Sequence, residues 1–143
     1  YPQREEENNI LRNYREGFTA DDPLSAGIKK VTDEKTLLAA CETIGSVVVD
    51  DSIIDYITGI VSATRSSMGV TIGASPRGSV ALFAACRVKA VLEGRDFVTP
   101  DDVKSLVFPV LRHRIIIDAE SEIEGLTADD FLSGIVSEIE VPR

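Results

Sequence analysis

A proline and an arginine stand together at the predicted start of a long helix, in the segment Gly73-Ala74-Ser75-Pro76-Arg77. Ser75 has a residue type that caps helices, because its hydroxyl can accept a hydrogen bond from an amide two or three residues on. Pro76 then takes the first helical position, where its fixed φ angle fits the helix. Arg77 therefore falls in the first turn, against the positive end of the helix dipole, which is unfavourable by roughly 0.3–1 kcal/mol.

An arginine in this place is suited to an anion. Amides at a helix N-terminus attract a phosphate, and the guanidinium of Arg77 offers a rigid fork of donors beside them. The alternative that these residues leave open is an ordinary capped helix with a solvated arginine.

Other catalytic motifs are missing from the sequence. It has no G-x-x-x-x-G-K-[ST] phosphate loop, dinucleotide fingerprint or Gly-x-Ser-x-Gly elbow. The single histidine, His113, cannot build a histidine-rich metal site. Adjacent aspartates stand at predicted helix starts, where acids stabilise the dipole, so we interpret them as caps and expect no metal site. These pairs are Asp50/Asp51, Asp101/Asp102 and Asp129/Asp130.

The composition is that of a globular chain with a core, with 143 residues of which 43% are hydrophobic and 27% charged. A net charge of −9 argues against a broad nucleic-acid or acidic-membrane surface. No apolar run approaches the ~18–20 residues of a membrane span. Cys41 and Cys86 fall in apolar helical patterns, and we expect both to be buried free thiols in a reducing cytoplasm.

Helical periodicity predicts a mainly α fold, a helical bundle. The β-branched segments Ile28–Val31 and Ile115–Ile117 are candidates for one short two-stranded β patch. The predicted helices cover residues 3–16, 32–44, 50–65, 76–93, 99–111 and 127–139.

Apolar residues at helical spacing predict which face of each helix is buried. The helix from Thr32 should bury Leu37, Leu38, Cys41 and Ile44. For the helix over 50–65 the predicted face is Ile53, Ile57, Ile60, Val61 and Thr64. For the helix that begins at Pro76 it is Val80, Phe83, Ala84, Val88 and Val91.

Arginines gather near the predicted helix ends of this acidic chain. Their forked geometry favours phosphate or carboxylate partners, and the alternative is pairing with surface acids. They are Arg65, Arg77, Arg95, Arg112 and Arg114.

An ordered series of motifs carries a family likeness. Gly73–Arg77 is followed by an alanine-rich helix, then by Gly94–Val103 and Val110–Ile115, and Ala63-Thr64-Arg65 precedes them. Further support comes from Tyr1-Pro2, Glu5–Glu7, Ile10-Leu11 and Val47–Tyr56. The series resembles the C-terminal lid of a MoxR-family AAA+ ATPase over nearly the whole chain. A related lid occurs in the ATPase subunit of magnesium chelatase.

The resemblance implies a single lid domain over residues 1–143, with residues 1–24 as the first lid helix and connector after an N-terminal ATPase core. That core would carry the Walker A, Walker B, sensor 1 and arginine-finger residues. The full-length protein would then bind ATP and Mg²⁺ and hydrolyse ATP, whereas the fragment alone would be inactive and bind no cofactor. It would act in the cytoplasm as a hexameric, chaperone-like remodelling ring, with partners that carry a von Willebrand factor A domain.

The resemblance also implies site residues. The second sensor motif of such lids supplies an arginine to the nucleotide phosphates, and Arg77 matches it as the catalytic residue. The apolar side of the first lid helix would lie near the adenine. Gly78 stands where the family more often has alanine, which loosens the helix start by up to ~1 kcal/mol. The implied nucleotide-binding set is Ala74, Ser75, Pro76, Arg77, Ile10 and Tyr14.

A rival hypothesis is a stand-alone helical module that binds a protein partner through the acidic segment Asp118–Glu140 or through Arg112–Arg114. A phosphate loop upstream of Tyr1 would decide for the ATPase. A DNA-binding regulator is a poorer candidate, because the net charge has the wrong sign and no predicted helix carries a basic face.

Overall fold

The computed structural model describes residues 1–22, 24 and 27–142 and divides the chain into two compact units, 1–39 and 40–143. None of the described helices is long and apolar enough to cross a membrane. The α-helices are α1 (Arg4–Arg15), α2 (Glu34–Gly45), α3 (Asp51–Ala63), α4 (Pro76–Leu92), α5 (Pro100–Leu111), α6 (Ala119–Ile123) and α7 (Ala128–Glu138). A 3₁₀ turn, η1 (Arg112–Arg114), and the strands β1 (Val70–Ile72) and β2 (Ile116–Ile117) complete the elements.

The first unit contains α1 and the start of α2. Helix α1 begins with a capping box between Gln3 and Glu6, and none of its residues is buried. Helix α2 is capped by Asp33, whose Oδ1 accepts the Thr36 amide at 2.7 Å, and not by Thr32 as predicted. The buried face predicted for α2 is also wrong, because its leucines and Cys41 are exposed.

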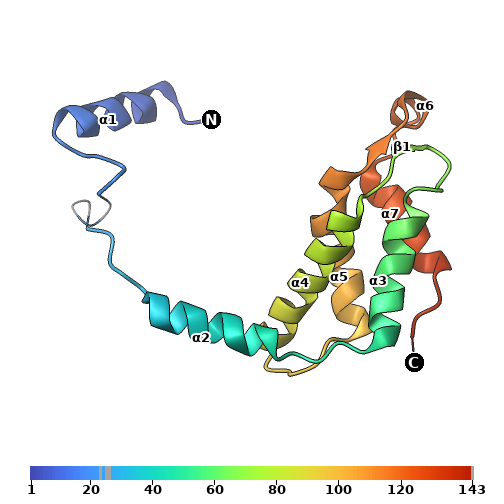
Figure 1. Ribbon diagram of the computed structural model, residues 1–143. Coiled ribbons are helices and arrows are strands. Elements are labelled where there is room, and N and C mark those ends of the chain that lie inside the picture. Colours follow the sequence, from blue (N-terminus) through green and yellow to red (C-terminus); the bar gives the residue numbers. More distant parts are fainter. Residues whose placement is uncertain (23, 25–26, 143) are drawn as a thin grey trace. The chain divides into compact units, whose positions relative to one another are not determined.

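In the second unit, helices α3, α4, α5 and α7 lie side by side around one apolar core (Figure 1). Helix α4 has its most extensive contact with α5. The mainly α bundle expected from the sequence is therefore confirmed. The largest fully buried side chains include Ile57, Ile60, Val61, Leu82, Val103, Val107, Leu111 and Leu132.

The buried face of α3 agrees with the prediction, and that of α4 does not. Helix α4 turns a line of mostly small residues to the core, Gly78, Leu82, Cys86 and Ala90. Small side chains at every fourth position allow a close approach between helices. The predicted face, in contrast, contributes only the half-buried Phe83 and Val91, while Val80, Ala84 and Val88 are exposed.

The small sheet joins β1 to β2 in antiparallel register, with Val70 opposite Ile117 and Ile72 opposite Ile116. The predicted use of residues 115–117 in a β pair is confirmed, but the predicted partner, 28–31, is wrong. Residues 28–31 have no regular structure and belong to the other unit. The sheet lies at the end of the bundle where α4 begins (Figure 1).

Paired acids cap the helices, as predicted. Helix α5 begins with a capping box formed by Thr99 and Asp102, and α7 begins with one formed by Thr127 and Asp130. Asp50 caps α3 by accepting the Ser52 amide at 2.9 Å. In the described residues no group of three or more His, Cys, Asp or Glu side chains could hold a metal ion.

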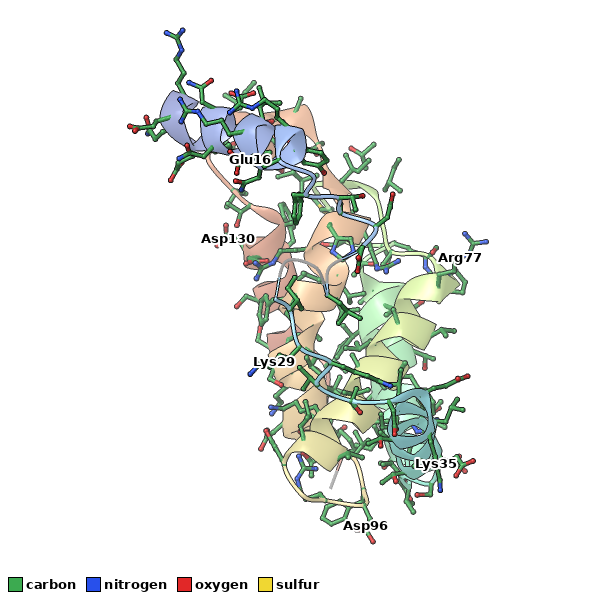
Figure 2. The ribbon with its side chains drawn as sticks, turned by 90° about the vertical axis from the view of Figure 1, so that its left-hand side faces the viewer. Glu16, Lys29, Lys35, Arg77, Asp96 and Asp130 are labelled. Atoms are coloured by element: carbon green, nitrogen blue, oxygen red, sulfur yellow. The ribbon has the colours of Figure 1, made fainter. Side chains whose placement is uncertain are left out.

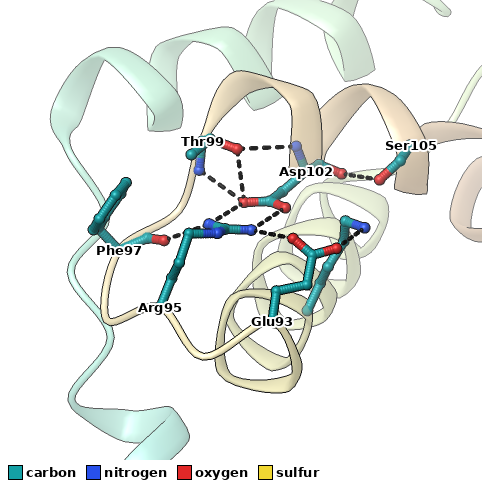
Figure 3. A network of polar contacts seen from close by, with 7 residues as sticks. Glu93, Arg95, Phe97, Thr99, Asp102 and Ser105 are labelled. Atoms are coloured by element: carbon teal, nitrogen blue, oxygen red, sulfur yellow. Dashed lines mark hydrogen bonds and ion pairs between the residues drawn. The ribbon is translucent and has the colours of Figure 1, made fainter.

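An ion pair fixes the connection between α4 and α5 (Figure 3). Both terminal nitrogens of Arg95 donate to the carboxylate of Asp102, at 2.8 and 2.7 Å, and one also reaches Glu93. The side chain of Asp102 is 2% exposed and also accepts hydrogen bonds from Thr99. Arg95 is therefore a structural residue of this junction.

Candidate functional site

Arg77 lies in the first turn of α4, directly after Pro76 at the first helical position. Figure 2 shows its side chain at the N-terminal end of the helix, directed away from the bundle. Ser75 is the N-cap residue, but its hydroxyl accepts no capping hydrogen bond. The carbonyl of Ser75 instead accepts the amide of Gly78 at 2.7 Å. The predicted position of the cap is correct, and the predicted role of its side chain is wrong.

Arg77 differs from the other cations of its unit. Among the described residues 40–142, it is the one arginine or lysine for which the structure records no hydrogen bond or ion pair. A free guanidinium in the first turn adds its charge to that of the helix dipole and to the amides without intrahelical partners. This end of α4 is thus prepared for an anion. The other cations bind as follows: Arg65 to Ala74, Arg87 to Gly45, Lys89 to Glu93, Arg95 to Asp102, Lys104 to Asp101, Arg112 to Asp129 and Arg114 to Val110.

The segment before Arg77 is attached to the end of α3. The hydroxyl of Thr64 accepts the amide of Ala74 at 2.9 Å and donates to the carbonyl of Val61 at 2.6 Å. Arg65 Nε donates to the carbonyl of Ala74 at 2.9 Å. The amide and the carbonyl of Ala74 are therefore both hydrogen-bonded, to Thr64 and to Arg65, which follow each other in the sequence.

Glycines on either side of Ala74 allow close packing. A Cβ at Gly73 would lie 2.6 Å from Arg65 Cα and 2.7 Å from Arg65 N, so another residue cannot fit without moving the backbone. A Cβ at Gly78 would lie 3.2 Å from Leu111 Cδ2 and 3.4 Å from Ala74 Cβ. Gly78 is buried and contributes to the contact between α4 and α5, in addition to any loosening of the helix start.

The cluster Arg112–Arg114 divides into residues with different surroundings. Arg112 forms an ion pair with Asp129 at 2.9 Å and so joins η1 to α7. Arg114 donates to the carbonyl of Val110 at 3.0 Å, and its Cδ lies 3.9 Å from the Cβ position of Gly78. Arg114 therefore lies beside Gly78 in the first turn of α4, and Gly78 is the residue that follows Arg77.

The sequence alone did not identify Thr64, Arg65 and Arg114 as neighbours of the Arg77 segment. Ala63-Thr64-Arg65 was part of the family likeness, but its contact with Ala74 spans nine or ten residues. Such a contact has no periodic signal in the sequence.

The remaining predicted site residues, Ile10 and Tyr14, lie on α1 in the unit of residues 1–39. Both are exposed, and the rings of Tyr14 and Phe18 form a T-shaped pair with centroids 5.3 Å apart. Their proposed place near an adenine stays a prediction.

Buried Cys86 offers no nucleophile. Burial, with a smaller contribution from the charge of Asp102, raises the pKa of its thiol to about 12. The thiol is therefore protonated at neutral pH, and the residue serves the packing of α4.

Comparisons with known proteins indicate the family. Residues 62–135 match the AAA lid domain family. The whole chain aligns with Chaperone MoxR1 of Mycobacterium tuberculosis at 32% identity and covers 38% of that protein. Over 65% of its length it is 43% identical to YeaC of Bacillus subtilis, covering 29% of that protein.

A solved structure has the same fold. A crystal structure of a candidate ATPase from Cytophaga hutchinsonii matches with a TM-score of 0.75 and 25% identity, over 100% of this chain and 44% of the other. The chain thus spans between 29% and 44% of the length of these proteins. It belongs to the AAA lid domain family, and the named relatives that it matches include MoxR proteins.

Proposed function

We propose that this chain is the nucleotide-sensing lid of a MoxR-type AAA+ ATPase, and that Arg77 contacts the terminal phosphates of ATP. One observation carries the proposal: within residues 40–142 as described, Arg77 alone among the arginines and lysines has no recorded polar partner in the protein. It also occupies the first turn of α4, where the dipole favours an anion.

In this proposal the nucleotide lies between the lid and an ATPase core elsewhere in the same polypeptide. ATP bound with Mg²⁺ would supply the phosphoryl group for transfer to water. The guanidinium of Arg77 would stabilise negative charge on the terminal phosphates, an interaction worth more in a site from which water is excluded. Loss of the terminal phosphate would remove this contact, so the lid would move as a rigid body between the ATP and ADP states.

The proposal extends to the role of the full-length protein. The full-length protein would form a hexameric, chaperone-like remodelling ring in the cytoplasm, and proteins with a von Willebrand factor A domain are the proposed partners. The name Chaperone MoxR1 of the Mycobacterium tuberculosis relative supports this role.

The stand-alone interaction module has less support. Part of the charge on which it depends is bound within the chain. Arg112 is paired with Asp129, and Asp118 and Asp130 accept hydrogen bonds at helix starts. These four residues are therefore less available to a partner than their sequence spacing suggests.

The test is ATP turnover by the full polypeptide with Arg77→Ala, beside Arg112→Ala as a matched control. Removing one charged donor to a reacting group costs roughly 10²–10³-fold in turnover. We expect that loss for Arg77→Ala, an unchanged circular dichroism spectrum, and near-normal turnover for Arg112→Ala. Normal turnover of the Arg77→Ala protein would refute the proposed role.

A further inference from the structure

Thr64 is a polar residue in an apolar place. It is the C-cap residue of α3, and its side chain is fully buried, at 0% exposure. A buried hydroxyl without partners would cost roughly 1–3 kcal/mol. Thr64 avoids that cost by donating to Val61 O at 2.6 Å and accepting from Ala74 N at 2.9 Å. The bond to Val61 returns to α3. The bond from Ala74 joins the end of α3 to the segment that leads into α4.

Arg65 binds the same residue from the other side. Its Nε donates to Ala74 O at 2.9 Å. The amide and the carbonyl of Ala74 are therefore both held by the end of α3. Ala74 is itself 0% exposed, so no water competes for these groups.

The position of Ala74 is transmitted to Arg77 over a short, stiff piece of chain. Ser75 has extended backbone angles, φ −75° and ψ 167°, and Pro76 has a ring that fixes its own φ. The residue before Ala74 is also held close to the end of α3, because Gly73 packs directly on the backbone of Arg65. Little freedom remains between Ala74 and the first turn of α4.

We infer that Thr64 and Arg65 form a clamp on Ala74 that sets the position of Arg77, so that both are positioning residues of the phosphate site. This inference rests on the proposed function of Arg77. The clamp touches no nucleotide and acts only through Arg77, which is what distinguishes it from a general contribution to folding.

A double-mutant cycle on ATP turnover by the full polypeptide tests the clamp. Thr64→Val removes the hydroxyl and keeps the shape of the side chain, and it is measured alone and together with Arg77→Ala. Because small displacements of a catalytic group can cost up to about 10²-fold, we expect Thr64→Val to lower turnover roughly 10- to 100-fold. In the Arg77→Ala background the same substitution should cause no further loss.

Matched variants separate positioning from stability. Thr58→Val removes a hydroxyl on the same helix that bonds only to carbonyls of α3, Ile54 O and Asp55 O, both at 3.0 Å. It should leave turnover unchanged. Thr64→Ser keeps the hydroxyl and should restore most of the turnover that Thr64→Val loses.

The outcomes distinguish the inference from the function on which it rests. Normal turnover of Arg77→Ala would overturn the proposed function. If Arg77→Ala is impaired, normal turnover of Thr64→Val, or an equal fold loss in both backgrounds, would overturn the clamp alone. If Thr64→Val does not fold by circular dichroism, Arg65→Met decides in the same cycle, because it removes the donor to Ala74 and keeps the aliphatic part of the side chain.

Discussion

Arg95 and Asp102 form a two-point ion pair across the turn between α4 and α5, with nitrogen–oxygen distances of 2.8 and 2.7 Å. Asp102 also belongs to the capping box of α5 with Thr99. One buried carboxylate therefore fixes both the start of α5 and its attachment to the end of α4. The core of the bundle depends on this junction, because α4 and α5 have the most extensive contact between helices.

Asp102→Asn should lower the free energy of unfolding by about 1–3 kcal/mol, because it removes the buried charged acceptor of Arg95 and Thr99 and leaves the Arg95 charge with the exposed carboxylate of Glu93. The measurement is urea denaturation of both proteins at neutral pH. Asp101→Asn is the control, since that neighbouring side chain is exposed and makes only a loose contact with Lys104 at 3.6 Å. Equal stability of the Asp101 and Asp102 variants would contradict this account of the junction.

The same pair should be visible in the response to acid. Burial opposes ionisation of Asp102, but hydrogen bonds from Arg95 and Thr99 outweigh it and hold its pKa below the ordinary value of 3.8. A lowered pKa in the folded state gives stability that is complete above pH 3.8 and is lost as the pH falls through the folded-state value. The melting temperature of the wild type should therefore fall more steeply below about pH 3.8 than that of Asp102→Asn. Parallel curves for the two proteins would show that Asp102 contributes nothing to the acid response.

The longer helices and the caps of α3, α5 and α7 could be predicted because the signals are local, whereas the short helix α6 was not predicted. Thr99 and Thr127 each stand three residues before an aspartate, and both form the predicted capping boxes. Helix α3 has most of its apolar residues on one side, so the predicted face is buried, together with Tyr56, while Ile54 is exposed.

The face of α4 could not be predicted, because this helix is apolar on nearly every side. Val80 and Leu92 are exposed, at 68% and 82%, although they are as hydrophobic as the buried Leu82. The choice of face depends on where small residues such as Gly78 let α5 approach, which is a property of the pair of helices. The partner of β2 was missed for a similar reason, since strand pairing joins distant segments.

The candidate site could be predicted only in part. The residue type and helix position of Arg77 indicate an anion site, and the structure adds that its charge is free among the described residues of its unit. The attachment of Ala74 to Thr64 and Arg65 depends on a chain reversal through β1, which the sequence does not specify.

Glycine substitutions should separate backbone strain from crowding. Gly94 has φ +74° with no atom within 4 Å of a Cβ, so Gly94→Ala should cost about 1 kcal/mol through strain alone. Gly69 has φ +83°, and a Cβ there would lie 2.6 Å from the ring of Phe131. Overpacking adds roughly 1–3 kcal/mol, so Gly69→Ala should be the more destabilising variant in urea denaturation. The opposite order would contradict the packing of Phe131 against the turn that leads into β1.

The thiol of Cys86 should be protected in the native protein. It is fully buried and its pKa is raised to about 12, so at pH 8 almost none of it is thiolate. Alkylation with iodoacetamide followed by peptide mapping should leave Cys86 unmodified until urea is added. Rapid native labelling at Cys86 would mean that the core beside α4 opens readily.

The most direct test of the central claim is a structure of the full polypeptide with a non-hydrolysable ATP analogue and Mg²⁺. The account predicts a guanidinium nitrogen of Arg77 at about 3 Å from an oxygen of the terminal phosphate. It also predicts that Thr64 and Arg65 keep their bonds to Ala74. An Arg77 side chain left in solvent, with another cation at the terminal phosphate, would contradict the account.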